Sequence, residues 1–517
     1  MINDSVRHVV VVGGGTAGWI TAGVLAAKCV KEQGRDLMIT LIESPTIGNV
    51  GVGEGTWPSM RTTLQAMGIS EAEFIQQCDA TFKQGARFNR WVDNAEIDFY
   101  YHPLMLPYNL GPLSTVTHWL DNAPNAEGLS YSAAVCHQEA ICEAGLAPKS
   151  ITTPEYQGNL NYAYHLDTNK FAAFIKDHCI NKLGVHHVVN DIIGTRAGED
   201  GEIAALQLAD NAELVADFYI DCSGFAGLLI DKHFKVPFID KSEVLFCDRA
   251  VAVQCPYGVN GKSVIASHTI STATGFGWIW DIGLQSRRGI GHVYSSRYIN
   301  DEEAAQGLRN YVGEAAQDLP LRFIKYTPGH REKFWRKNCV AVGLSAGFVE
   351  PLEASSILLV EISAYWIAEK LPQYKSGFAR CEQQFNEIFR YRWDTIIEFL
   401  KLHYCLSKRR DTPFWRDNTS TESIPDTLLE KLAMWQEHCP SVLDFLNRAD
   451  VFPFESYCYI LYGMKFKTAT HRPDEKNLQR LEHKVTNLRR HLTALMSALP
   501  ANRALIDAIR KHGLQKI

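Results

Sequence analysis

The chain has 517 residues, of which 46% are hydrophobic, and a formal net charge of −6 from 52 basic and 58 acidic side chains. This length exceeds what one simple core accommodates, so we expect two or three structural units. The mildly acidic balance gives no electrostatic reason to expect a nucleic-acid partner.

The first predicted element is a buried strand at 8–12, whose four consecutive valines precede a glycine-rich turn. Gly13, Gly15 and Gly18 stand at G-x-G-x-x-G spacing. The first glycine permits a tight turn, the second lets backbone approach a pyrophosphate, and the third lets a helix pack closely on the strand. The helix expected from Thr16 would direct its positive end at the phosphate.

A second strand is predicted from Leu37 to Ile42 and ends at Glu43, an acid suited to binding a ribose hydroxyl. Glu43 lies 25 residues after Gly18 (43 − 18), near the usual offset of roughly 20. Strand, glycine triplet, helix, strand and acid in this order predict a dinucleotide site. The glycine-rich stretch 48–55 either lets backbone approach the same ligand or forms a surface loop.

Residues 9–27 carry no charged side chain, a length that approaches a membrane span. Five glycines interrupt this stretch, and no basic segment precedes it. We therefore expect a cytoplasmic protein without a membrane segment or signal peptide.

The middle of the chain alternates in character. Residues 59–90 are expected to be helical and 91–165 irregular and aromatic, with strands following at 185–193, 202–208 and 214–221. The last strand runs into Asp221-Cys222-Ser223-Gly224. These small residues mark either a second approach to a cofactor or an ordinary strand end.

Antiparallel strands are predicted from 243 to 295, another buried strand at 338–345, a helix from about Glu353 through Lys370, and mainly helices after 375. A leucine-rich stripe at helical spacing lies between Leu478 and Leu495. We expect it to pack on its own domain rather than form a coiled coil, because it covers less than three heptads.

Three groups of side chains are candidates for chemistry. Trp278 and Trp280 stand two apart, so on a strand their rings would form one apolar wall; core packing is the alternative. Lys83 lies among small and aromatic residues. It is either a nucleophile or hydrogen-bond donor, or else an ordinary surface lysine. Glu353 lies where a helix begins, and the backbone amides of Ser355 and Ser356 there could hold an anion.

Two further patterns are rejected as sites. Residues 343–347 fit the G-x-S-x-G elbow of hydrolases, but that motif needs an immediate helix, and Pro351 disfavours one. Cys136, His137 and Cys142 match no zinc spacing, and the thirteen cysteines include no C-x-x-C pair. We expect reduced thiols and no metal.

Together these pieces resemble the flavin-dependent tryptophan halogenase family, within the glutathione-reductase-type FAD monooxygenases. The similarity extends to about residue 465. It is carried by residues 51–54, 82–83, 162–167, 220–225, 277–282 and 347–353. The double tryptophan together with the lysine segment is specific among flavoproteins, whereas the glycine triplet and Asp-Cys-Ser-Gly mark the wider FAD fold.

The resemblance implies an α/β, glutathione-reductase-type FAD-binding fold with β-sheets and a mainly helical substrate-binding subdomain. We assign 1–395 to the FAD module, with a substrate-side insertion at about 91–165, and 396–517 to the helical region. The flavin contacts implied by the family fall on Gly13, Gly14, Gly15, Thr16, Ala17, Gly18, Glu43, Gly51, Val52, Ile192, Leu344 and Ile357.

The resemblance also implies a reaction divided between two chambers. FADH2 from a separate reductase, with oxygen and chloride or bromide, would yield hypohalous acid, which travels through a tunnel to Lys83. Lys83 would hold the oxidant by hydrogen bonding or as a haloamine, and Glu353 would orient it and stabilise the cationic arene. Trp278 and Trp280 would keep the organic substrate away from the flavin.

Three departures from the family pattern bear on specificity. Gly283 replaces the proline that usually ends the tryptophan motif, and Ser355-Ser356 replaces the usual Thr-Gly halide pair, which puts halide preference in question. The tyrosine pair that binds free tryptophan is broken at Cys458. An indole, pyrrole, phenol or larger tryptophan-containing substrate all remain open. Candidate slot residues, with core packing as the alternative, are His102, Trp119, Phe454 and Tyr457.

The leading hypothesis is FADH2-dependent halogenation of an electron-rich, indole-like small aromatic. Its competitors are an aromatic hydroxylase and a flavin-binding protein without turnover. No second glycine triplet marks a nicotinamide site, in agreement with a separate flavin reductase. The family habit is the sole basis for expecting a homodimer.

Overall fold

The computed structural model describes residues 4–48, 53–108, 119, 129–257, 263–445, 450–469 and 475–515. The chain forms two compact units, each assembled from three segments. Unit 1 comprises Met1–Asp79, Leu166–Lys241 and Thr327–Trp393, and unit 2 comprises Ala80–His165, Ser242–Tyr326 and Asp394–Ile517. The expected boundary at 395/396 stays a prediction.

Unit 1 is built on a six-stranded sheet. Its strands, in spatial order, are β20 (Trp335–Arg336), β21 (Cys339–Ala341), β12 (Phe218–Asp221), β1 (His8–Val12), β2 (Met38–Glu43) and β8 (His186–Val189). All pairs are parallel except the edge pair β20–β21. The valines of β1 are at most 2% exposed because helices and strands cover both faces.

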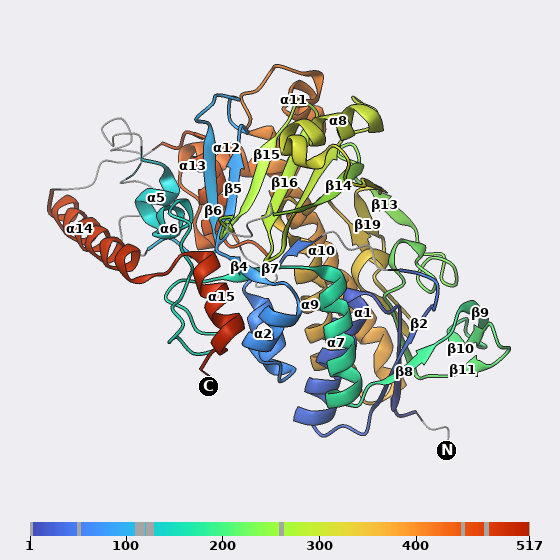
Figure 1. The fold of residues 1–517 in the computed structure, drawn as a ribbon. Coiled ribbons are helices and arrows are strands. Elements are labelled where there is room, and N and C mark those ends of the chain that lie inside the picture. Colours follow the sequence, from blue (N-terminus) through green and yellow to red (C-terminus); the bar gives the residue numbers. More distant parts are fainter. Residues whose placement is uncertain are drawn as a thin grey trace. The chain divides into compact units, whose positions relative to one another are not determined.

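Three helices of unit 1 pack together beside this sheet (Figure 1). They are α1 (Thr16–Leu25), which continues as a π-helical segment over Ala26–Glu32, α7 (Thr168–Leu183) and α9 (Ser355–Lys370). The βαβ unit predicted from the glycine triplet is confirmed, since β1 and β2 are parallel neighbours joined by α1. Asp167 caps α7 through the N–H groups of Asn169 and Lys170.

Besides the first part of α10 (Phe378–Cys405), the remaining helices and strands of unit 1 are short. They are β3 (Glu54–Gly55), α2 (Ser59–Ala66), α3 (Glu71–Gln77), β9 (Ile192–Ala197), β10 (Ile203–Leu208), β11 (Glu213–Leu214), β13 (Phe238–Asp240), β19 (Gly329–Arg331) and β22 (Gly347–Phe348). The strand predicted at 202–208 is confirmed as β10, whereas the one predicted at 185–193 is divided into β8 and β9 and the one at 214–221 into β11 and β12.

Unit 2 contains a seven-stranded sheet. Its order is β18 (Arg322–Lys325), β14 (Arg249–Pro256), β17 (Arg287–Tyr294), β16 (Gly277–Gly283), β15 (Thr269–Ala273), β5 (Gly85–Asn89) and β6 (Phe99–Pro103). The predicted antiparallel pattern between 243 and 295 is confirmed in β14–β17, β17–β16 and β16–β15. A separate pair joins β4 (Thr81–Lys83) to β7 (Ala163–Leu166).

The seven-stranded sheet of unit 2 is accompanied by helices. They are α5 (Tyr131–Val135), α6 (Gln138–Glu143), α8 (Asp301–Val312), the end of α10 (Phe378–Cys405), α11 (Pro413–Asn418), α12 (Asp426–Glu437), α13 (Phe454–Gly463), α14 (Glu475–Ala498) and α15 (Asn502–His512). The largely helical end of the chain is thus confirmed.

The helical prediction for the end of 59–90 is wrong, because residues 81–89 form β4 and β5. Lys and Ala favour helix locally, but tertiary pairing decides here. Phe88 stacks on Tyr100 of the neighbouring strand at 4.8 Å between ring centroids. The segment 91–165 was expected to be irregular. Four elements that were not anticipated lie or begin in it, namely β6, α5, α6 and β7.

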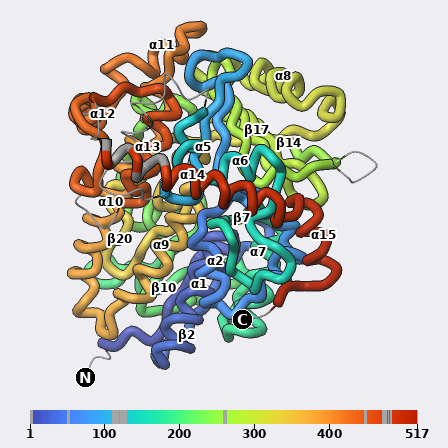
Figure 2. Tube along the Cα trace, turned by 90° about the vertical axis from the view of Figure 1, so that its left-hand side faces the viewer, coloured from blue at the N-terminus to red at the C-terminus, as the bar shows by residue number. Residues whose placement is uncertain are grey.

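The leucine stripe of α14 packs on its own unit. Figure 2 shows α14 lying alongside α6, and Leu495 shares a cluster with Ile141 of α6, while Leu492 packs at its edge. The backbone of Leu488 accepts a hydrogen bond from His137. The side chains of Leu478 and Leu481 lie outside the described residues. Along the described segments, every helix is too short or too polar to cross a membrane.

Candidate functional site

The glycine triplet of unit 1 is shaped by close backbone contacts. A Cβ on Gly13, whose φ is +116°, would lie 2.3 Å from the carbonyl oxygen of Cys222. A Cβ on Gly18 would lie 1.9 Å from the carbonyl oxygen of Gly13. Glycine is therefore required at both positions, and the Asp-Cys-Ser-Gly strand end runs directly beside the loop.

The first turn of α1 offers backbone donors to an anion. Gly15 precedes this helix, and no side chain caps it. The N–H groups that follow from Thr16 and Ala17 therefore keep their hydrogen-bonding capacity for a ligand, at the positive end of the helix. This donor set fits the pyrophosphate of a dinucleotide.

Glu43 lies at the mouth of the glycine loop. Its Oε1 accepts hydrogen bonds from Lys176 Nζ at 2.5 Å and from His187 Nε2 at 2.8 Å. Its Oε2 is the atom nearest to a Cβ built on Gly14, at 1.6 Å. The two basic partners thus fix the carboxylate with one oxygen directed toward the loop, where a ribose would bind.

Other expected flavin contacts also fall in unit 1. The N–H of Asn190 bonds to the carbonyl of Glu43 at 3.0 Å, and Ile192 opens β9 two residues later. Leu344 belongs to a 3₁₀ turn at Gly343–Ser345, which approaches α1 so closely that a Cβ on Gly343 would lie 2.9 Å from Ala17 Cβ. Ile357 is buried in the first turn of α9. Gly51 and Val52 lie outside the described residues.

The structure gives Ser345 no role as a nucleophile. It is 1% exposed, and its hydroxyl donates to the backbone carbonyls of Asp221 and Val342. The following residues form a short strand, β22, rather than the α-helix a hydrolase elbow requires.

The start of α9 is a second uncapped helix terminus in unit 1. Ala354 precedes it in the left-handed conformation, with φ +53°, and no side chain caps the helix. Ser355 Oγ is buried and has no hydrogen-bond partner within the described part of the chain. Glu353 is 5% exposed, and its backbone carbonyl accepts a hydrogen bond from the indole N–H of Trp57 at 2.8 Å. Ser356 is half-buried.

Lys83 is a buried residue of unit 2. It ends β4 and is only 4% exposed, so the surface interpretation is wrong. Lys83 pairs with Ala163 and Thr81 pairs with His165 across β4 and β7. Because opposite residues of paired strands share a face, Lys83 and His165 lie on the same side of this ribbon.

The double tryptophan forms the expected wall. Trp278 and Trp280 lie on β16 with ring centroids 6.4 Å apart, 0% and 7% exposed. Trp278 contacts Trp91, and a Cβ on Gly291 of β17 would lie 2.1 Å from the Trp280 ring. The Trp280 ring therefore packs directly on β17, and the Trp278 ring packs beside Trp91.

The candidate slot residues gather in unit 2. His102 Nε2 is 3.0 Å from Ser456 Oγ, and its ring lies 5.8 Å from that of Phe399. Tyr457, 1% exposed, packs edge-on against Phe399 at 4.8 Å. Trp119 joins a neighbouring group of rings through contacts with Tyr131 and Tyr462. Phe454, the first residue of α13, is half-buried.

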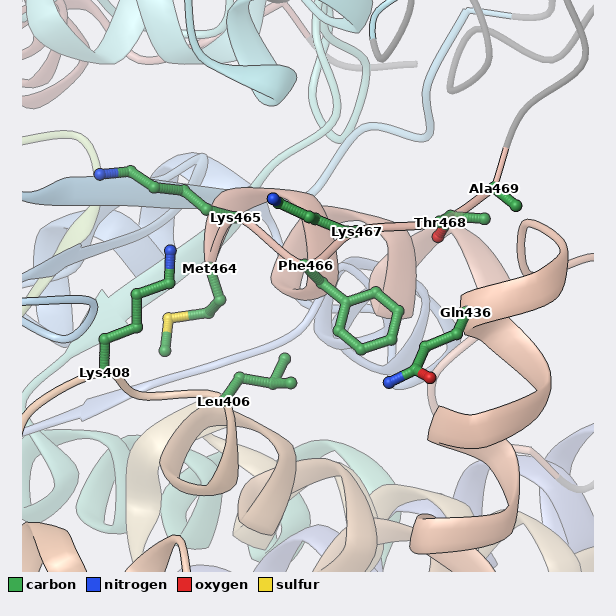
Figure 3. A pocket seen from close by; sticks show the side chains of 9 residues that line it. All are labelled: Leu406, Lys408, Gln436, Met464, Lys465, Phe466, Lys467, Thr468 and Ala469. Atoms are coloured by element: carbon green, nitrogen blue, oxygen red, sulfur yellow. The ribbon is translucent and has the colours of Figure 1, made fainter.

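A cavity of about 630 Å³ also lies in unit 2 (Figure 3). Its lining is Leu406, Lys408, Gln436, Met464, Lys465, Phe466, Lys467, Thr468 and Ala469. None of the residues predicted from sequence lines it. In the described part of the chain, no group of three His, Cys, Asp or Glu residues is arranged to hold a metal ion.

The model of the tryptophan halogenase family matches residues 8–479. The 7-chloro-L-tryptophan 6-halogenase KtzR of Kutzneria is 34% identical over 475 residues, which cover 88% of this chain and 90% of the relative. The chain belongs to the tryptophan halogenase family. Among solved structures, a tryptophan halogenase from Shewanella frigidimarina is 42% identical, with a TM-score of 0.95 and complete coverage of both chains.

A further solved relative, described as a flavin-dependent halogenase from Xanthomonas campestris, is 32% identical with a TM-score of 0.87, covering 99% of each chain. The predicted fold class and the assignment to flavin-dependent halogenases are therefore confirmed. Several partners of the predicted site residues were not expected from the sequence, namely Lys176, His187 and Phe399. Their spacing carries no motif, because tertiary structure alone brings them to the site.

Proposed function

We propose that this protein uses reduced FAD, dioxygen and chloride or bromide to halogenate an electron-rich aromatic of the indole class. The observation that carries the proposal furthest is the burial of Lys83, at 4% exposure, in a chain of this family. A lysine shielded from bulk water can hold a reactive oxidant without releasing it.

The nucleotide part of FAD fits the described residues of unit 1. The loop Gly13–Gly18 and the start of α1 would bind the pyrophosphate, Glu43 the ribose, and Ile192, Leu344 and Ile357 would contact other parts of the cofactor. The bound, reduced flavin supplies the oxygen chemistry that converts halide into hypohalous acid.

The start of α9 is the candidate halide site. The uncapped N–H groups of Ser355 and Ser356 and the buried Ser355 hydroxyl can donate to an anion there. The Ser356 side chain narrows this space relative to a glycine. Chloride and bromide are both candidate substrates, and the space left by Ser356 bears on which of them is preferred.

Lys83 would receive the hypohalous acid and direct its halogen at the arene, by hydrogen bonding or as a haloamine. Glu353 would stabilise the positive charge of the arene and take its proton. The packed wall of Trp278 and Trp280 would keep the substrate from the flavin, so that halogenation rather than hydroxylation follows.

The substrate side rests on His102, Trp119, Phe454 and Tyr457, which lie among aromatic rings of unit 2. KtzR acts on 7-chloro-L-tryptophan, and an indole ring matches this apolar, aromatic surrounding. A separate flavin reductase, a cytoplasmic location and a homodimer complete the proposal.

The test incubates the protein with a flavin reductase, NADH, FAD, and a library of indoles and phenols, with chloride and bromide in turn. Mass spectrometry should detect halogenated products whose halogen follows the salt supplied. Oxygenated products under excess halide would instead assign an aromatic hydroxylase, and flavin binding without any turnover would contradict both activities.

A further inference from the structure

Lys83 belongs to a series of ionisable side chains in unit 2. His165, which pairs with Thr81 two residues before Lys83, shares its face of the β4–β7 ribbon and is fully buried. The pKa of His165 lies well below its usual value because of burial, with further contributions from the charge of Lys83 and from His268. His165 is thus an uncharged base within electrostatic reach of the lysine.

The series continues from His165 toward the seven-stranded sheet. His165 Nε2 is 2.8 Å from Thr269 Oγ1, and His268 is the preceding residue. Burial, then the charge of Arg87, lowers the pKa of His268 to about 3. The Nδ1 atoms of both histidines are buried without a hydrogen-bond partner in the described residues. His268 is among the causes that lower the pKa of His165, so the two rings lie within electrostatic reach of each other.

The outer end of the series reaches solvent. His268 Nε2 is 3.4 Å from the hydroxyl of Tyr101, which donates a hydrogen bond to Glu143 Oε1. Arg87 Nε lies 3.5 Å from the same carboxylate, whose side chain is 41% exposed. Burial raises the pKa of Tyr101 above its usual range, so this hydroxyl passes protons without ionising.

We propose that four side chains carry protons between Lys83 and the protein surface: His165, His268, Tyr101 and Glu143. The assignment rests on the proposed function, in which Lys83 receives the oxidant. Halogen transfer to the lysine requires its lone pair, because an ammonium group has none.

The proton transfers balance without any redox change. An N–H bond of the Lys83 ammonium breaks, a new N–H bond forms on His165, and the positive charge moves with the proton. A neutral amine remains at Lys83. Because burial disfavours a charged imidazole, His165 releases a proton from its other nitrogen in the same step, toward His268 and Tyr101, and the carboxylate of Glu143 accepts it at the surface.

The first test measures the electrostatic coupling between Lys83 and His165 without flavin or substrate. Nitrogen NMR of histidine-labelled protein follows the titration of His165 in wild type, Lys83→Met and Lys83→Arg. The pKa of His165 should rise in Lys83→Met, which removes the charge, and stay close to wild type in Lys83→Arg. An unchanged titration in Lys83→Met would overturn the proposal.

The second test measures halogenation of an indole across pH. His165→Gln keeps a polar group for Thr269 but cannot take a proton, and Tyr101→Phe removes the link to Glu143. Both should lower kcat about 10- to 100-fold, with KM for the indole and FAD affinity unchanged. Imidazole should partly restore kcat in His165→Gly, which a purely structural role would not allow.

The matched control is Tyr100→Phe, since Tyr100 is equally buried but bonds to His403 at 2.7 Å, off the proposed path. Wild-type kcat in both His165→Gln and Tyr101→Phe would overturn the path while leaving the halogenase assignment intact. If Lys83→Ala retains halogenation, the lysine mechanism fails instead, and the NMR titration still decides whether the two side chains are coupled.

Discussion

At the scale of single residues, the sequence motif predicts the role of Glu43 but not the side chains that orient it. Its offset from the glycine triplet predicts a ribose-binding acid, but the sequence gives no reason to select Lys176 or His187 as its partners. They come from α7 and β8, and only the parallel pairing of β2 with β8 brings His187 beside the carboxylate. Hydrogen-bond partners of this kind orient a ligand-binding side chain.

Lys176→Met should therefore weaken FAD binding about fivefold, equivalent to about 1 kcal/mol for a partly exposed ion pair. The reason is that Glu43 loses one of the two donors that fix its orientation. Flavin fluorescence quenching gives the Kd. Lys170→Met on the same helix is the control. Lys170 pairs with Asp79 rather than with Glu43, so this variant should bind FAD as wild type does.

At the scale of elements, the start of α9 was predicted as a helix terminus, and the structure adds the left-handed Ala354 and the buried Ser355 hydroxyl. Ser356→Gly removes the side chain that narrows the terminus. We expect the ratio of kcat/KM for bromide to that for chloride to rise, by about threefold to tenfold, which corresponds to about 1 kcal/mol.

Competition between the two halides, read by mass spectrometry of one product mixture, measures this ratio directly. Ser363→Gly, further along the same helix, is the control, because its hydroxyl bonds to the carbonyl of Leu359 rather than facing the terminus. A ratio that moves equally in both variants would mean that the α9 terminus does not select the halide.

A buried acid on the same helix affects stability. Glu361 accepts hydrogen bonds from Thr63 at 2.5 Å and Ser59 at 2.9 Å, which joins α9 to α2. Burial raises its pKa to about 7 from 4.5. The folded state therefore binds more protons than the unfolded state between these values, so stability falls as pH rises through this window.

Glu361→Gln should remove this loss. Its free energy of unfolding relative to wild type should increase between pH 5 and pH 8, by up to about 3 kcal/mol. Denaturant unfolding at both pH values measures the change, with the exposed Glu369→Gln as control. A difference that is the same at pH 5 and pH 8 would show that Glu361 does not titrate in this range.

Elements were predictable where their pattern is local. The valine strand, the alternating strands of 243–295 and the carboxyl-terminal helices follow from side-chain periodicity. Residues 81–89 were not predictable, because their β conformation depends on β7 and β6, which come later in the chain. The lysine itself was recognised by family resemblance, whereas its burial emerges only from that pairing.

At the scale of the whole molecule, the chain crosses between its two units several times, so neither unit is one continuous segment. The sequence predicted an FAD module and a helical region in succession. It could not reveal the interleaving, since two of the five crossings lie inside single elements, β7 and α10. The residues proposed to bind the nucleotide nevertheless all fall in unit 1.

Hydrogen exchange should therefore register FAD mainly in unit 1. Ligand that binds only the folded state stabilises it by about 2.7 kcal/mol at a concentration 100 times its Kd. We expect slowed exchange in peptides covering 13–18 and 343–345, and little change in α14. Protection confined to peptides of unit 2 would contradict the placement of the nucleotide.

The central claim is that the buried Lys83 directs the oxidant to the substrate. The most direct measurement compares wild type, Lys83→Ala and Lys83→Arg for indole halogenation, with a thioether present to trap hypohalous acid that escapes. We expect at least about a 100-fold loss of halogenated indole in Lys83→Ala, with FAD affinity retained and oxidised thioether still formed. Undiminished, regioselective halogenation by Lys83→Ala in the presence of the trap would contradict it.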